Sequence, residues 1–215
     1  MIVFQTVRSH QPAFNLRPTT RGVLAVLIAA LCSLPVAAQN TFQANGDWFT
    51  PGNWSLGTVP VNGETVIVNA NVDLTNSTAV LASYTLNASR THTFRGTNTA
   101  LLATNVTIYG TMTHDANSAT ATNESGLWVP DHRVYIMCTN LTVATGGVID
   151  ADYKGYNTRC GSGAGGGANF LGGGGYGGAG GSGDNGGAGA TYGSASSPSD
   201  PGSGGGQYGS GRGGG

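Results

Sequence analysis

A short acidic segment contains the residues whose types and spacing come closest to supporting chemistry. Asp150, Asp152 and Lys154 alternate along the chain, and alternating residues of a β-strand share one face. Paired carboxylates can hold Ca²⁺ or, beside a basic residue, assist polysaccharide cleavage. Two carboxylates fall short of the about six or more oxygens that Ca²⁺ takes. Asp150 and Asp152 are therefore weak calcium candidates, and we expect a solvated turn at this place.

Histidines offer the other candidate chemistry. In the segment Asp131-His132-Arg133, an adjacent acid and imidazole have no nucleophile in a recognisable setting, so the segment does not predict a catalytic triad. His92 and His114 lack a second ligand at metal spacing, and we expect them at the surface or at strand ends. No catalytic or cofactor-binding residue is assigned. Whether the chain is an enzyme stays open, with a non-enzymatic role favoured.

Three tryptophans are candidates for contact with a glycan. The rings of Trp48, Trp54 and Trp128 could stack on sugars, because aromatic faces supply the apolar part of such contacts. The alternative for Trp48 and Trp54 is structural, with both rings covering the first layer of a β core. Extracellular glycans or cell-surface components are therefore the partners we consider.

The start of the chain predicts export. Residues 1–38 combine a positive region, an apolar run from Gly22 to Leu34, and small residues before Gln39. The apolar run is shorter than the roughly 20 residues of a comfortable membrane span. We therefore expect a signal peptide, cleavage near Ala38-Gln39 and a secreted or cell-surface protein without a membrane span after cleavage. A signal anchor is the alternative.

The charge of the chain after residue 38 argues against a nucleic-acid partner. This part contains six basic and ten acidic side chains, a net charge of −4. Phosphate backbones require clustered Lys and Arg, which are absent from the sequence. Only 9% of all residues are charged, so Thr, Asn, Ser and Gly supply most of the polar character.

Residues 41–152 predict an all-β fold. Short runs rich in Val, Ile, Thr and Tyr alternate with turn residues, and no run shows a sustained helical period. The expected strands are Thr65–Asn69, Val80–Leu86, Thr91–Phe94, Leu101–Ala103, Val106–Tyr109, Val134–Cys138, Leu141–Val143 and Val148–Ala151.

A degenerate repeat lies within these strands. Asn71-Val-Asp-Leu74, Asn105-Val-Thr-Ile108 and Asn140-Leu-Thr-Val143 share one pattern, at separations of 34 and 35 residues. So short a pattern also arises by chance in an Asn- and Thr-rich chain. If it is a true repeat, it predicts stacked coils that bury their faces against one another. In such a solenoid we expect Val66, Val106 and Leu141 to stack in register.

The last part of the chain is dominated by glycine. Of the 55 residues from Gly161 to Gly215, 27 are glycine. Residues 172–189 keep a three-residue period, which matches a polyproline-II helix, although simple disorder is an alternative for such a composition. We divide the chain into a signal peptide (1–38), an N-terminal cap module (39–64), β coils (65–156) and a glycine-rich segment (157–215). Because no capping segment follows the glycine-rich residues in this sequence, we expect an N-terminal fragment of a longer protein.

Two stretches resemble large bacterial exported repeat proteins of the adhesin and autotransporter type. The first runs from Gly46-Asp-Trp48 through Asn53-Trp54-Ser55 to Val59-Pro60-Val-Asn-Gly-Glu-Thr-Val-Ile-Val68 and also distantly resembles the G8 domain. The second is Asn140-Leu-Thr-Val-Ala-Thr-Gly-Gly-Val-Ile-Asp-Ala-Asp-Tyr-Lys-Gly-Tyr156. The resemblance implies a right-handed parallel β-helix with an N-terminal cap. It carries no catalytic residue onto this sequence.

The two cysteines that follow the leader fit such a fold. Cys138 and Cys160 form an even pair, which predicts a disulfide in an oxidising compartment; two free buried thiols are the alternative. Their separation is close to one coil of a β-helix, whose neighbouring strands lie about 4.8 Å apart.

Taken together, these features predict an exported structural or adhesive surface protein with no chemistry of its own. The alternatives are the leading segment of a secreted carbohydrate-active enzyme and a glycan-binding module.

Overall fold

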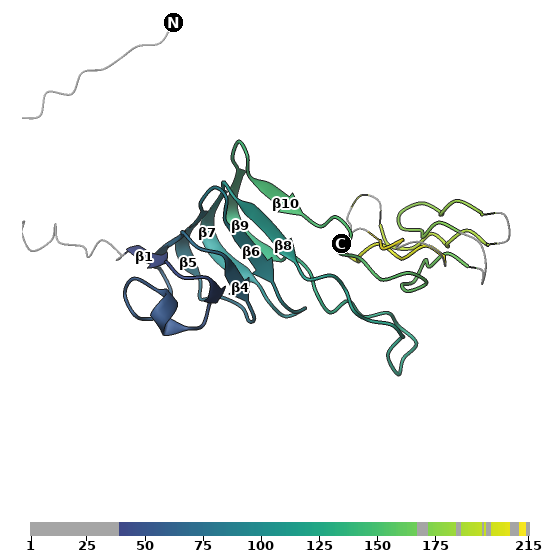
Figure 1. The fold of residues 1–215 in the computed structure, drawn as a ribbon, viewed down its shortest axis with the longest axis horizontal. Coiled ribbons are helices and arrows are strands. Elements are labelled where there is room, and N and C mark those ends of the chain that lie inside the picture. The colour runs from purple at the N-terminus through teal and green to yellow at the C-terminus, as the bar shows by residue number, and fades with distance from the viewer. Residues whose placement is uncertain are drawn as a thin grey trace, which may run out of the picture. The chain divides into compact units, whose positions relative to one another are not determined.

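The computed structural model describes residues 39–166, 172–183, 186–194, 196, 199–206 and 211–213. The predicted signal peptide, residues 1–38, lies outside the described residues. The described residues form ten β-strands and one short 3₁₀ helix, Pro51–Asn53, and the predicted all-β class is confirmed (Figure 1). In this part of the chain, no helix has the length and apolar character needed to cross a membrane.

Consecutive strands alternate between two parallel five-stranded sheets. The odd-numbered strands form sheet A and the even-numbered strands form sheet B, each in sequence order. Sheet A contains β1 (Gln39–Phe42), β3 (Thr65–Val68), β5 (Leu81–Leu86), β7 (Leu101–Ile108) and β9 (Ile136–Val143). Sheet B contains β2 (Gly46–Asp47), β4 (Val72–Leu74), β6 (Thr91–Phe94), β8 (Thr111–His114) and β10 (Val148–Asp150).

The register of sheet A aligns apolar residues in rows that cross the strands. Val66 lies opposite Tyr84, Tyr84 opposite Val106, and Val106 opposite Leu141. The predicted alignment of Val66, Val106 and Leu141 is therefore confirmed. Because successive side chains of a strand point to opposite faces, each row is either wholly inward or wholly outward.

The repeat predicted from the sequence is correct only in its second and third copies. Asn105–Ile108 and Asn140–Val143 are register partners on β7 and β9. The first copy, Asn71–Leu74, lies in sheet B instead, where Val72 pairs with His92. The error arises because both sheets use the same apolar alternation, so a four-residue pattern does not identify the sheet.

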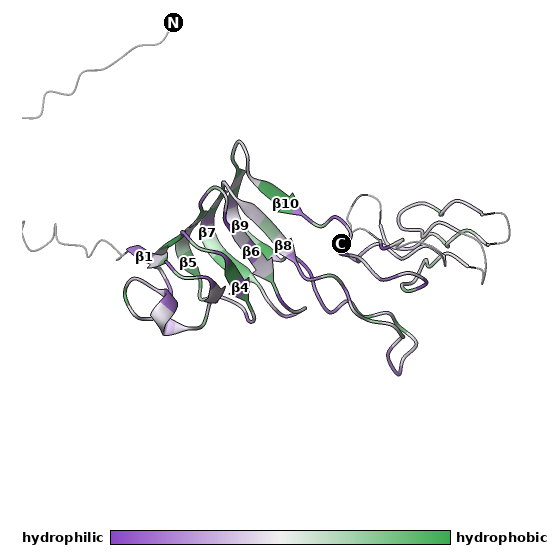
Figure 2. Cartoon of the chain, in the orientation of Figure 1, coloured by the Kyte–Doolittle hydropathy of each residue, from purple (hydrophilic) through white to green (hydrophobic). Residues whose placement is uncertain are grey.

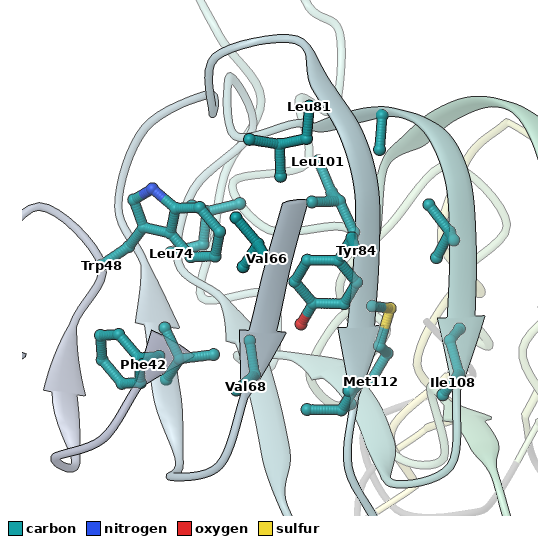
Figure 3. Close-up of a cluster of buried hydrophobic side chains, with 14 of the residues drawn as sticks. Phe42, Trp48, Val66, Val68, Leu74, Leu81, Tyr84, Leu101, Ile108 and Met112 are labelled. Carbon is teal, nitrogen blue, oxygen red and sulfur yellow. The ribbon is translucent and has the colours of Figure 1, made fainter. Parts of the chain in front are cut away.

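The core lies between the inward rows of the two sheets. Buried aliphatic and aromatic side chains from both sheets meet there, and Figure 3 shows Val66, Val68 and Tyr84 among them with Trp48 and Phe42 nearby. His92 is also fully buried, which corrects the expectation of a surface position. In β6, Thr91 and Thr93 take the outward positions, so His92 must point inward.

The N-terminal edge of sheet A is covered by the segment that follows β2. Ser55 donates its backbone N–H to the carbonyl of Thr41 (2.8 Å), and Gln43 donates to that of Asn53 (2.8 Å). The Trp54 indole donates to the backbone carbonyl of Trp48 at 2.7 Å. Because β1 and β2 pair with β3 and β4, residues 39–64 also contribute strands to the two sheets.

The opposite edge of the sheets is open among the described residues. The inward row ends at Leu141 on β9, which is 48% exposed although its neighbour Val106 is only 1% exposed. On β10, Val148 and Ile149 are also exposed, and Figure 2 shows this strand as a hydrophobic stretch.

The described residues of the glycine-rich segment form no helix or strand, but backbone hydrogen bonds link their turns. Gly175 donates to the carbonyl of Gly163 (2.8 Å), and Gly206 donates to that of Gly172 (2.8 Å). A Cβ atom on Gly172 would lie 2.0 Å from the carbonyl oxygen of Gly187. Gly172 is therefore packed backbone to backbone, and glycine is required there because no side chain fits.

Candidate functional site

The acidic pair predicted as a weak calcium site forms a local turn. Asp150 ends β10, and its Oδ1 accepts a hydrogen bond from the backbone N–H of Asp152 at 2.9 Å. Asp150 lies opposite Thr113 on the neighbouring strand, which supplies no further carboxylate. Within the described ranges, no group of three or more His, Cys, Asp or Glu residues could hold a metal ion. Asp150 and Asp152 therefore share a local turn at the end of β10.

The tryptophans differ sharply in exposure. Trp48 is fully buried and Trp54 is only 3% exposed, so neither presents a ring face to a sugar. Their rings pack edge to face, with centroids 4.6 Å apart. Trp128 is half-buried and packs edge to face against Tyr156 at 5.4 Å. The structural alternative for Trp48 and Trp54 is the one that their burial supports.

Cys138 and Cys160 are both free thiols in the structure, so the predicted disulfide is not formed. Cys138 is half-buried on β9, opposite Ala103. Cys160 is buried in the glycine-rich segment, where its thiol donates to the backbone carbonyl of Thr158 at 3.4 Å. The two side chains thus have separate local environments.

The Asp131-His132 pair fastens a long loop and does not activate a nucleophile. The Asp131 carboxylate accepts hydrogen bonds from both the backbone N–H and the hydroxyl of Ser118. Burial raises the pKa of Asp131, but the hydrogen bonds from Ser118 and the neighbouring His132 lower it, and the pKa lies below its usual value. The hydroxyl of Ser118 donates to the carboxylate and not to His132, whose Nε2 lies 3.8 Å from Asp131. A serine bound in this way is not deprotonated by the imidazole.

Buried Asn117 anchors the other side of this loop. Its side-chain oxygen accepts the backbone N–H of Asp131 (2.9 Å), and its amide donates to the carbonyl of Lys154 (3.0 Å). Both halves of the amide are therefore used within the protein. The charged residues that the sequence singled out here serve the loop connecting β8 to β9.

The outward face of sheet A carries two rows of polar side chains, which we call the outer rows. One row follows the register of Gln39 across the five strands and the other follows that of Thr41; on β7 and β9, the apolar pair Leu102 and Met137 precedes both rows. Their members are Gln39, Thr65, Ser83, Asn105 and Asn140 in the first row, and Thr41, Ile67, Thr85, Thr107 and Thr142 in the second.

The outer rows contain no charged residue, and Ile67 is their one apolar member. Two pairs of neighbours in the first row are bonded: the Ser83 hydroxyl donates to Thr65 (3.2 Å), and the Asn140 amide donates to Asn105 (2.8 Å). Strand spacing sets the members of one row about 4.8 Å apart, while the two rows lie roughly 7 Å apart along each strand. The result is a rigid array of hydroxyl and amide groups that can offer many hydrogen bonds to a polyhydroxylated surface.

Sequence reasoning did not identify this array as a candidate site. The alternation of polar and apolar residues in each strand was visible, but alignment between strands follows from a register that single strands do not encode. No protein-family model, curated protein or solved structure matches this chain.

Proposed function

We propose that this chain is an exported cell-surface protein with a structural or adhesive role, and that its strands begin a right-handed parallel β-helix. The leader pattern of residues 1–38 supports export. The alternation of consecutive strands between two parallel sheets supports the β-helix. Its hand follows from the general rule that connections between parallel strands of one sheet are right-handed in about 98% of cases.

The observation that carries the adhesive role is the uncharged array of the outer rows. Each hydrogen bond to a sugar hydroxyl contributes only about 0.5–1.5 kcal/mol net. A rigid array adds such bonds with little loss of side-chain freedom, because Thr and Asn are already held in the sheet. Adhesion through many weak contacts therefore suits this face, and it requires no reactive centre.

The proposal is tested with the full chain exported from a bacterial host. We expect N-terminal sequencing to begin at Gln39, and we expect the exported protein to bind polysaccharides on a glycan array without releasing reducing ends. Release of reducing ends would contradict the adhesive role and favour the leading segment of a carbohydrate-active enzyme.

A matched pair of variants locates the binding face. Thr85→Val with Thr107→Val removes two hydroxyls from the outer rows at nearly constant shape, and we expect weaker binding. Thr91→Val with Thr111→Val makes the same change on the outward face of sheet B, where the two residues are register partners. Equal losses from both pairs would show that the outer rows are not the binding surface.

A further inference from the structure

A shallow groove follows sheet A at the corner where its strands turn toward sheet B. Asn69, Asn87 and Tyr109 directly follow β3, β5 and β7. Asn87 donates its backbone N–H to Val68 (3.1 Å), and Tyr109 donates to Leu86 (2.8 Å), so these residues continue the ladder of the sheet. The groove has a volume of about 500 Å³ and is lined by Asn69, Asn87, Ala88, Arg90 and Tyr109.

The turn that carries Arg90 is fixed by the backbone. Ser89 has a left-handed φ of 60°, and Arg90 donates its N–H to the carbonyl of Asn87 (3.3 Å). The carbonyl of Arg90 in turn accepts the N–H of Thr111 (2.8 Å). A Cβ on buried Gly110 would lie 2.3 Å from that carbonyl oxygen, so only glycine lets the two segments approach. The backbone position from which the Arg90 side chain extends is therefore fixed.

The guanidinium of Arg90 is available for a ligand. Arg95 pairs with Asp73 and Asp115, Arg133 donates to Thr97 and stacks on Tyr135, and Arg212 donates to Asn117 and Gly155. Arg159 also has a partner. Among the residues that the structure describes, Arg90 has no hydrogen bond or ion pair through its side chain.

The neighbours of Arg90 add the other groups that sugar recognition needs. Tyr109 is 44% exposed, and its ring supplies an apolar face with a polar tip. The Asn87 amide donates to the Asn69 oxygen, which leaves the amino group of Asn69 and the oxygen of Asn87 to bind hydroxyls. A guanidinium binds a carboxylate through two parallel hydrogen bonds, which are stronger than bonds between neutral groups.

We propose that this groove binds a sugar that carries a carboxylate, such as a uronic acid within a polysaccharide. The carboxylate pairs with Arg90, the sugar ring lies on Tyr109, and ring hydroxyls bond to Asn69 and Asn87. The inference rests on the proposed adhesive role and names the ligand class at one place on the surface.

Calorimetric titration of the full chain with a short oligogalacturonate tests the proposal. We expect Arg90→Gln to weaken binding about tenfold or more, because a hydrogen-bonded charge is lost. Arg90→Lys keeps the charge but loses the two-pronged geometry, so its loss is smaller. Tyr109→Leu weakens binding between about twofold and tenfold through the lost aromatic face.

The matched control is Arg133→Gln, which removes a second exposed arginine that also lies beside a tyrosine. Arg133 does not line the groove, and we expect unchanged affinity. Methyl esterification of the oligomer should remove the Arg90-dependent part of binding. An Arg90→Gln variant with parental affinity, or an equal loss in Arg133→Gln, would overturn the assignment, as would preference for a sulfated neutral oligosaccharide.

Failure of this inference can be distinguished from failure of the proposed function. If the parent binds neutral polysaccharides and Arg90→Gln binds them equally, while no acidic oligomer binds, the groove assignment is wrong and the adhesive role stands. If the parent binds neither acidic nor neutral glycans, both proposals are wrong.

Discussion

Val106 and Leu141 are direct register partners on β7 and β9, yet Val106 is 1% exposed and Leu141 is 48% exposed. Both occupy the same inward row. Val106 has a strand on either side, whereas Leu141 has a described strand on one side only. The difference shows that burial in this fold comes from the neighbouring strand in the stack and not from residue type alone.

This relationship predicts a large contrast between two threonine substitutions. Val106→Thr buries a hydroxyl in an apolar row and should lower the free energy of unfolding by about 1–3 kcal/mol. Leu141→Thr keeps its hydroxyl accessible to water and should cost less than about 1 kcal/mol. Chemical denaturation measures both. Equal losses in the free energy of unfolding from the two substitutions would mean that Leu141 is covered in solution.

A second contrast tests the packing of the glycine-rich segment. A Cβ on Gly180 would lie 2.0 Å from the Gly173 carbonyl oxygen, whereas a Cβ on Gly181 meets nothing within 4 Å. We therefore expect Gly180→Ala to increase hydrogen exchange at the Gly189 amide, because the added Cβ displaces the Gly173 carbonyl that accepts the Gly189 N–H. Gly181→Ala should leave exchange unchanged. Fast exchange throughout the parent segment would indicate the disorder that the composition alone permits.

Buried His92 predicts a loss of stability in mild acid. Burial lowers the pKa of His92 from 6.5 to about 3, and its Nδ1 lies 2.6 Å from the Tyr84 hydroxyl. Between these values the unfolded chain binds a proton that the folded chain does not. The free energy of unfolding should therefore fall as pH falls below 6.5, by up to about 1.4 kcal/mol per pH unit.

A variant that combines His92→Phe with Tyr84→Phe provides the control for this pH dependence. Denaturation above about pH 5, where most carboxylates remain ionised, should show a smaller slope than in the parent. His114, whose pKa burial also lowers, contributes in the same direction and is present in both proteins. An unchanged slope would mean that His92 is not the group responsible.

The two free thiols predict how many cysteines react with an alkylating reagent. In a protein that begins at Gln39, alkylation of the unfolded chain under non-reducing conditions should modify both Cys138 and Cys160. In the folded protein, half-buried Cys138 should react faster than buried Cys160, because reaction requires access to the thiolate. Mass spectrometry distinguishes these cases. A protein that gains no alkyl group before reduction and two after it would show that Cys138 and Cys160 form the disulfide predicted from the sequence.

The fold class was predictable because the alternation of polar and apolar residues within a short run indicates a β-strand by itself. In Thr91-His-Thr-Phe94 the period of two identified a strand, and the structure places β6 there. Phe94 lies on the same face of the strand as His92, so the period of two also indicated which face turns inward, whereas the polar type of His92 alone suggested the surface. Packing against Tyr84 and Trp48 decides its orientation.

Features that depend on contacts between distant segments could not be predicted. Trp54 is buried because Ser55 returns to bond with Thr41 at the edge of β1, which composition does not show. The groove is assembled from three turns at unequal separations in the sequence, so Asn69, Arg90 and Tyr109 gave no joint motif. Trp48 and Trp54 were visible as candidates, and their burial agrees with the structural alternative that the sequence offered for them.

The most direct test of the proposed β-helix start is the pairing of β5 in solution. Tyr84 has Val66 on one side and Val106 on the other, both in parallel strands. Nuclear Overhauser contacts from the backbone of β5 should therefore connect it to β3 and to β7 in parallel register. Nuclear Overhauser contacts typical of antiparallel pairing would contradict the stacked arrangement. Contacts that place β5 directly beside β4 or β6 in one sheet would contradict it as well.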